Sequence, residues 1–536
     1  NSKTYKVANK ATNTFELNDV DGNAVDTSGY STYTSGGVAN KIYQITTNYL
    51  TAELFDIKVA QSADVLYITH PNHEVSKLER TGHTSWTLSE VDFTKGPFLA
   101  ANTTSVTLTT SATTVGSGRT LTASSSLFAS TDVGRQVELG DGWGTITGYT
   151  SATEVTWTIT EAATGSGSTT WSLGAFSDTT GHPSAVSFFE QRLIFSGTNN
   201  EPQTLYFSKS GDYENFTAGT DADSAMIYTI ASNQVNAIRF LKAQRTLIVG
   251  TTGGEYTVTA GSDEAITPSN VTIKKQSSFG SANVDALAVE NAVLFLQRAK
   301  RKVRELRYNF EEDGYSAADL TILNDAVTNT GVNEMEYQQS PDGLVWVVRD
   351  DGVLGSMTYQ RSENVVAWSR HKVGGKFTEC TITVSDYANI ATATKLVFTK
   401  SDGSTVTFTS TTGTAGTDEF KTETNNNTTA DNIYTAINAH ADFTVENPAA
   451  AVVTIKETSP EATGFLTVKS YDTTRLATTN QSHSVVESVA SISGSLNEDE
   501  LWVIVKRTIN GSTRRYVEVF SDFDFDETDA EVFHFV

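Results

Sequence analysis

The chain has 536 residues, 38% of them hydrophobic, and a single cysteine, Cys380. This length exceeds what one hydrophobic core organises, the apolar content argues against wholesale disorder, and one cysteine excludes an internal disulfide framework. The net charge of −25 disfavours binding to nucleic acid or to an anionic membrane, because phosphate contacts need clustered Lys and Arg. DNA remains conceivable as a passenger, since a passage that lets DNA slide should lack adhesive cations.

The N-terminal part of the chain is predicted to contain two β units. Residues 1–50 form a partial β module with short strand-like stretches. Residues 51–94 contain a repeat phrase, in which an apolar strand such as 65–68 is followed by a turn at 70–72 and by a further strand. No apolar run approaches the roughly 20 residues of a membrane-spanning helix, so no membrane segment is expected.

Residues 95–180 interrupt the repeat. They are rich in Thr, Ser and Gly and alternate in stretches such as 154–159, which predicts an inserted β-rich module of barrel or sandwich type. The repeat phrase resumes over residues 181–372. Its copies there are centred on residues 185–207, 237–258, 286–308 and 335–359.

A second interruption covers residues 373–486. Its order of strand, strand, helix, strand, strand predicts an inserted ββαββ module, with the helix near 429–440. Residues 487–536 hold the last repeat and an acidic end. Both ends of the sequence are strand-like or apolar, so the chain is expected to continue beyond them.

The repeat phrase determines the predicted fold class. Units of this kind cannot bury their apolar faces alone and must stack on neighbours. Antiparallel hairpins with Gly, Pro and Asn turns fit four-stranded blades, and a closed ring of blades removes exposed sheet edges. We therefore predict an all-β fold: a β-propeller-like platform of about six blades with inserted small β and α+β modules. The alternative is two or three ordinary β-sandwiches.

Two groups of side chains have the composition of a cation site. His70 and His73, with His83 ten residues on, could bind zinc or another divalent ion, although a polar turn explains them as well. Asp522, Asp524 and Asp526 alternate along a strand-like stretch, which could hold calcium, meet a basic partner or simply form a solvated strand edge.

One dense basic run stands out in this acidic chain. It could pair with an acidic neighbouring subunit, grip DNA phosphates or form a solvated hairpin. We prefer a subunit contact with the acidic end, because one local cluster suits a ring interface better than a DNA-binding groove. The candidate interface residues are Arg298, Lys300, Arg301, Lys302 and Arg304 on one side and Asp522, Asp524 and Asp526 on the other.

The sequence does not single out catalytic residues. Phosphate loops, Ser-centred elbows and His-Glu-x-x-His motifs are missing, and residues 340–346 resemble a sialidase Asp-box only loosely. Cys380 lies in a strand-like stretch, which favours an inert buried thiol. The chain is thus predicted not to be an enzyme and to need no cofactor.

Several long stretches resemble the tail nozzle proteins of short-tailed bacteriophages, a family also called tail tubular protein B. The similar stretches are residues 14–17, 64–71, 181–197, 202–205, 208–216, 246–256, 267–271 and 276–280. The resemblance implies a virion tail protein that forms a homo-hexameric ring below a dodecameric adaptor of the tail tubular protein A type. It also implies a central DNA conduit, gated until infection, and contacts with tail fibres or tailspikes. It carries over no site residues, because these motifs mark turns.

Three functional hypotheses follow from the sequence. The first is a structural nozzle subunit that extends the DNA conduit, gates genome release and supports the fibres. The second is a carbohydrate-binding or depolymerising tail propeller. The third is a calcium-stabilised surface binding module.

Overall fold

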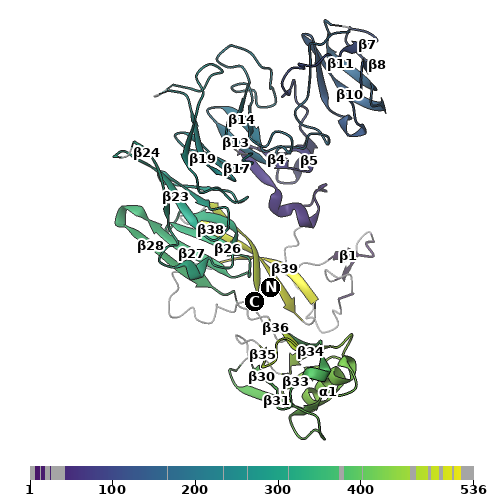
Figure 1. Cartoon of the computed structure of the whole chain (residues 1–536), viewed down its shortest axis with the longest axis vertical. Helices are drawn as coiled ribbons and strands as arrows, with labels where there is room; N and C mark the ends of the chain where they lie inside the picture. The colour runs from purple at the N-terminus through teal and green to yellow at the C-terminus, as the bar shows by residue number, and fades with distance from the viewer. Residues whose placement is uncertain are drawn as a thin grey trace. The chain divides into compact units, whose positions relative to one another are not determined.

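In the computed structural model, the chain consists of two compact units, residues 1–47 and 48–536. Figure 1 shows the whole chain. In the first unit, β1 (Lys6–Ala8) pairs antiparallel with β2 (Glu16–Asn18). The residues that the structure describes are 6–11, 14–18, 24–25, 43–165, 167–232, 235–261, 264–311, 313–373, 379–400, 402–458, 466–480, 484–493, 499–509 and 512–520.

Six antiparallel sheets in the second unit correspond to the six sequence repeats. Five have four strands and one has three described strands, and each sheet keeps its strands in chain order. Blade one is β3 (Lys58–Ser62), β4 (Val65–His70), β5 (His73–Gly82) and β6 (Ser85–Glu90); blade two is β13 (Ala185–Phe189), β14 (Arg192–Ser196), β15 (Thr204–Phe207) and β16 (Met226–Thr229); blade three is β17 (Ile238–Ala243), β18 (Leu247–Thr251), β19 (Gly254–Thr259) and β20 (Thr272–Ser277).

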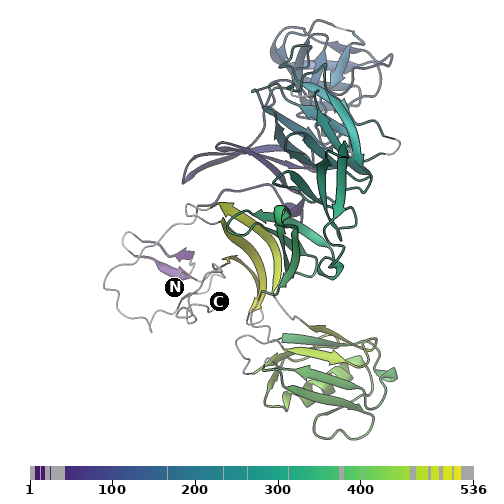
Figure 2. The same ribbon diagram turned by 90° about the vertical axis from the view of Figure 1, so that its left-hand side faces the viewer.

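The remaining blades follow the same plan. Blade four is β21 (Leu287–Val289), β22 (Ala292–Leu296), β23 (Val303–Asn309) and β24 (Gly314–Asp319); blade five is β25 (Val332–Gln338), β26 (Leu344–Arg349), β27 (Leu354–Gln360) and β28 (Val365–His371); blade six is β37 (Val485–Ser493), β38 (Asp499–Ile509) and β39 (Ser512–Val519), yellow in Figure 2. The predicted all-β propeller fold with about six blades is confirmed.

Apolar cores join consecutive blades. Strands such as β14 and β22 are buried on both faces, because each middle strand packs against two neighbouring blades, and this explains their continuous apolar sequences. Between blades three and four, for example, the rings of Phe240 and Phe295 lie 6.2 Å apart. Similar clusters lie between blades one and two, two and three, four and five, and five and six.

The junction between blade six and blade one differs from the other five. No comparable apolar cluster joins these two blades within the described parts of the chain. Ile504 and Val517, which pair across β38 and β39, are 36% and 68% exposed. The ring of blades therefore has a seam, by which we mean the junction between blade six and blade one that lacks a packed apolar core.

The first insertion is a six-stranded antiparallel sheet in the order β12-β9-β10-β11-β8-β7. Leu108 of β7 exchanges backbone hydrogen bonds with Ser168, close to β12, so the sheet curls toward a barrel around Trp157. Its strands are β7 (Leu108–Thr110), β8 (Gly116–Ala123), β9 (Gln136–Leu139), β10 (Gly142–Ser151), β11 (Glu154–Glu161) and β12 (Trp171–Leu173).

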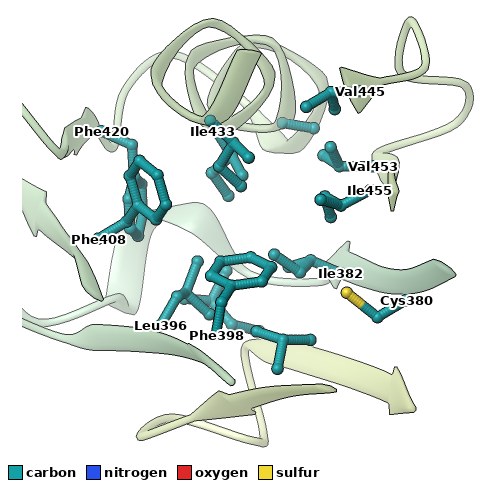
Figure 3. Close-up of a cluster of buried hydrophobic side chains, with 14 of the residues drawn as sticks. Cys380, Ile382, Leu396, Phe398, Phe408, Phe420, Ile433, Val445, Val453 and Ile455 are labelled. Atoms are coloured by element: carbon teal, nitrogen blue, oxygen red, sulfur yellow. The ribbon is translucent and has the colours of Figure 1, made fainter. Parts of the chain in front are cut away.

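The second insertion contains the predicted ββαββ core and four further strands. Its two sheets have the orders β33-β34-β29-β36 and β32-β31-β30-β35, and α1 (Asn426–Asn438) packs on them; Cys380 lies in their shared core beside Ile382 (Figure 3). The strands are β29 (Glu379–Val384), β30 (Lys395–Thr399), β31 (Thr405–Thr411), β32 (Glu419–Lys421), β33 (Phe443–Val445), β34 (Val452–Glu457), β35 (Thr467–Ser470) and β36 (Leu476–Asn480).

Candidate functional site at the propeller hub

The first strands of all six blades line one cavity of about 660 Å³, which we call the hub. In each blade the chain begins at this innermost strand, so six separate sequence repeats contribute to one space. Ile504 of β38 and Arg515 of β39 also line the cavity. Because these strands are not the innermost ones, the hub extends along the free face of blade six into the seam.

A short helical segment lies at the hub. The segment η1 (Thr51–Asp56) directly precedes β3, and its Leu54 and Phe55 line the cavity while remaining 51% and 55% exposed. Asn283, which precedes the innermost strand of blade four, donates a hydrogen bond to Asp56 Oδ1 at 2.9 Å. The segment is thus joined to blade four by this hydrogen bond and to blade one by the chain itself.

Charged side chains gather in the hub. Lys58 of blade one is buried, and its Nζ lies 3.1 Å from Asp285 Oδ1, just before the innermost strand of blade four. Arg515 pairs with Glu487 of blade six, with Nε 2.5 Å from Oε2. The first ion pair connects blades one and four, the second lies within blade six, and both partly neutralise the hub.

Glu334 and Glu336 form the most perturbed charge pair of the hub. They are two residues apart on β25, so their side chains project from the same face of the strand. Glu334 accepts hydrogen bonds from the Val489 backbone N–H at 2.8 Å and from the Ser488 hydroxyl at 3.1 Å. Burial, with a further contribution from the charge of Glu334, raises the pKa of Glu336 to about 7. Glu336 can therefore exchange a proton near neutral pH.

Sequence reasoning did not identify this pair. The chain has 63 Asp and Glu residues, and none is marked by a motif. The available signal was two glutamates at alternate positions of an innermost strand. Only the assembly of the six blades shows that this face is enclosed.

The basic run lies at the turn between β22 and β23. Arg298, Arg301 and Lys302 are exposed, and Lys302 forms an ion pair with Asp319. Lys300 is half-buried, and its Nζ donates a hydrogen bond to Asn333 Oδ1 at 3.0 Å. These four residues are compatible with the predicted subunit interface.

Arg304 occupies a different environment from the rest of the run. It is only 9% exposed, its Nη1 donates to the Ala317 carbonyl at 2.8 Å, and its guanidinium lies 3.4 Å from the centre of the Phe279 ring. Arg304 makes these contacts within the protein, because its side chain on β23 points away from solvent. It is therefore not available to a partner subunit. The proposed acidic partners Asp522, Asp524 and Asp526 lie outside the described residues.

Both insertions leave the propeller from the same face. In a four-stranded antiparallel meander, the turn between the second and third strands lies at the end where the fourth strand finishes. The insertions follow the fourth strands of blades one and five, so they share this face with the β22–β23 turn. We call it the insertion face. A hydrogen bond from Val332 N–H to the Lys300 carbonyl, 2.9 Å long, agrees with this placement.

The predicted histidine group is only partly assembled. The rings of His70 and His73 lie 4.9 Å apart, on either side of the β4–β5 turn. His83 lies at the next turn, with its Nδ1 3.3 Å from Arg80 Nη2. His83 is thus not part of the same group. Glu53, whose Oε2 lies 2.8 Å from His73 Nε2, does belong to the group and was not predicted.

Comparisons with known proteins find no family and only distant structural similarities. No family model matches the chain, and no curated protein matches its sequence. Among solved structures it is similar to the WD40 domain of Neurospora crassa Pan2, with 9% identity, 59% of this chain and 79% of that chain covered and a TM-score of 0.26. The β-propeller domain of Myceliophteria thermophila Cps50 (Swd1) gives 8% identity, coverages of 60% and 96% and a TM-score of 0.25.

An auxiliary nutrient binding protein from Bacteroides thetaiotaomicron gives 10% identity, coverages of 59% and 93% and a TM-score of 0.23. No inference about this chain is based on these likenesses. Within the described residues, no helix has the length and apolar character needed to cross a membrane.

Proposed function

We propose that this chain is a structural subunit of a bacteriophage tail, which assembles as a hexameric nozzle below an adaptor ring and supports tail fibres or tailspikes. The observation that carries the proposal is the set of stretches resembling tail nozzle proteins, which lie, apart from residues 14–17, in the blades and the loops that adjoin their strands. Residues 181–197, for example, span β13 and β14, and residues 246–256 span β18 and the start of β19. In the proposed nozzle these stretches form the platform.

The packing of the blades supports a mechanical role. Five apolar interfaces connect the six blades, and burying each large apolar side chain contributes about 1.5–3 kcal/mol. Blades joined in this way resist bending, because close-packed interiors transmit strain. A platform of this kind suits a protein that must hold a DNA conduit in shape during genome release.

The insertion face supports contacts with other tail proteins. Both inserted modules have their own apolar cores, around Trp157 and around Phe398, and both leave from this face. The exposed part of the basic turn lies on the same face and offers charge to an acidic neighbour. In the proposed ring this face carries the contacts to adjacent subunits, to the adaptor or to the fibres.

The excess of acidic residues supports DNA passage through the ring. A net charge of −25 per chain repels phosphates, so DNA in the proposed conduit would not adhere to the wall. In this proposal the chain is located in the virion tail. DNA passes through the ring without specific binding.

The mass of the assembly in solution tests this proposal. We expect the purified chain at micromolar concentration, alone or mixed with adaptor rings, to give a species of six chains. A chain that stays monomeric or dimeric under both conditions would contradict the nozzle assignment.

The hub favours one alternative function. A carboxyl group with a pKa of about 7 in a cavity, next to a second carboxylate, is the kind of group that acts as general acid in glycoside hydrolysis. A depolymerising propeller would cleave host surface polysaccharide in the hub. New reducing ends that appear with the native chain and not with Glu336→Gln would favour this alternative over a purely structural role.

A further inference from the structure

Three side chains with metal-binding atoms converge beside the hub. Glu53 comes from η1, His70 ends β4, and His73 begins β5. One possible ligand atom from each residue lies within 4.8 Å of the others. The turn between the two histidines brings the rings together, and the segment before β3 brings the carboxylate to them.

The group is partly enclosed, with His70 buried and Glu53 and His73 half-buried. His70 is 2% exposed, and the Nε2 of His73 lies 2.8 Å from Oε2 of Glu53. The Tyr49 ring packs edge-on against both imidazoles, at centroid distances of 6.1 Å from His70 and 5.1 Å from His73. Such packing restricts the rotation of the histidine rings, so the three ligands are held close to one another before any ion binds.

We propose that Glu53, His70 and His73 form a binding site for a divalent transition metal, with zinc as the best match. Two imidazoles and one carboxylate are ligands that zinc accepts together, whereas calcium and magnesium prefer oxygen atoms alone. Tetrahedral zinc, with bonds of about 2.0–2.1 Å, separates its ligand atoms by about 3.3 Å. The observed group reaches this spacing by small side-chain movements. Water or a further ligand completes the coordination.

The ion would fasten η1 to blade one. Glu53 belongs to the segment whose Leu54 and Phe55 line the hub, and the histidines flank a turn on the insertion face. Without the ion, the link consists of one hydrogen-bonded pair between Glu53 and His73. With the ion, a metal–ligand bond from Glu53 joins the segment to an ion that both histidines of blade one also bind. The proposed site therefore stabilises η1 beside the hub, and this inference does not depend on the nozzle assignment.

Metal content tests the proposal directly. The full-length chain is treated with a chelator, dialysed against zinc sulfate and then dialysed against buffer. The zinc that it retains is measured by inductively coupled plasma mass spectrometry. We expect about one zinc ion per native chain, a melting temperature that rises with zinc concentration, and the visible absorption of a low-symmetry site when cobalt replaces zinc. Dialysis against calcium should leave the melting temperature unchanged.

Matched variants locate the bound ion. His70→Asn, His73→Asn and Glu53→Gln should each lose the retained zinc and the zinc-dependent rise in melting temperature. His83→Asn is the control, because this histidine lies at the neighbouring turn outside the group, and it should bind as the native chain does. Far-UV circular dichroism verifies that each variant is folded.

Amide hydrogen exchange of residues 49–56 gives a second measurement, which needs no variant. Zinc should slow exchange in this segment of the native chain and leave the second insertion unaffected. A native chain that retains no zinc, or one whose zinc is retained equally by all three ligand variants, would overturn the proposal.

Discussion

Burial of a carboxyl group at the hub gives the protein a titration near neutral pH. The pKa of Glu336 is raised from the ordinary value of 4.5 to about 7, first by burial and then by the charge of Glu334. The folded chain therefore binds this proton more tightly than the unfolded chain does. Its stabilising effect is complete below about pH 4.5 and is lost as the pH rises toward 7.

Glu336→Gln should reveal this effect, because glutamine resembles the protonated acid. We expect the variant to be more stable than the native chain by about 2–3 kcal/mol at pH 8 and to differ little near pH 4.5. Urea unfolding at both pH values measures the difference. A variant that is equally stable or less stable at pH 8 would show that ionised Glu336 does not destabilise the native chain at that pH.

Arg304 and Arg301 are close in sequence and should respond very differently to truncation. Arg304→Ala removes hydrogen bonds to Gln297 and Ala317 and the contact with Phe279, so we expect a loss of about 2–4 kcal/mol. Arg301→Ala, at an exposed turn position, should change stability by no more than about 0.5 kcal/mol. Thermal unfolding of both variants measures the contrast, and equal losses would contradict the placement of Arg304.

At the scale of elements, the contact between blades three and four depends on a glycine. Gly250 lies opposite Phe240 in the β17–β18 pair, and a Cβ at this position would lie 2.1 Å from the Phe240 ring. Gly250→Ala should therefore push Phe240 out of its packing and destabilise the protein by about 1–3 kcal/mol. Gly148→Ala is the matched control, since its Cβ would meet nothing closer than 3.7 Å. Comparable losses in the two variants would contradict this packing.

The second insertion should fold by itself. Its core draws only on residues from Cys380 to Leu476, including Phe398 and Ile433, and α1 is capped by the Asn425 side chain, which accepts a hydrogen bond from Thr428 N–H at 2.9 Å (Figure 3). We expect a fragment of residues 373–486 to unfold cooperatively on heating. A fragment with no cooperative transition would show that the module depends on the propeller.

The sequence predicted the elements that have a strong local signal. The middle strands of the blades are apolar on both faces, and the helix of the second insertion has one apolar side, so both were recognisable. The stretch around Cys380 was recognised as strand-like, but its partner β36 was missed, because β36 is short and mostly polar and pairs with β29 across about 95 intervening residues. His70 and His73 were predicted as a candidate cation site, but Glu53 was not, since the fold of the segment before β3 and not sequence spacing brings its carboxylate to them.

At the scale of the whole molecule, charge reversal at the basic turn tests the proposed subunit interface. Arg298 and Arg301 are exposed on the insertion face, so Arg298→Glu with Arg301→Glu should leave the melting temperature nearly unchanged. The same pair of changes should weaken assembly, and more strongly at low salt, because exposed charges interact over about 10 Å at 0.1 M salt. Sedimentation at two salt concentrations measures both effects. Assembly that is unaffected by the changes would exclude this turn from the interface.

Electron microscopy of the purified chain mixed with its adaptor ring tests the central claim most directly. The proposal predicts particles with sixfold symmetry, in which six-bladed propellers surround an axial pore. Particles that contain isolated propellers, each with an accessible hub and no contact to another copy, would contradict it.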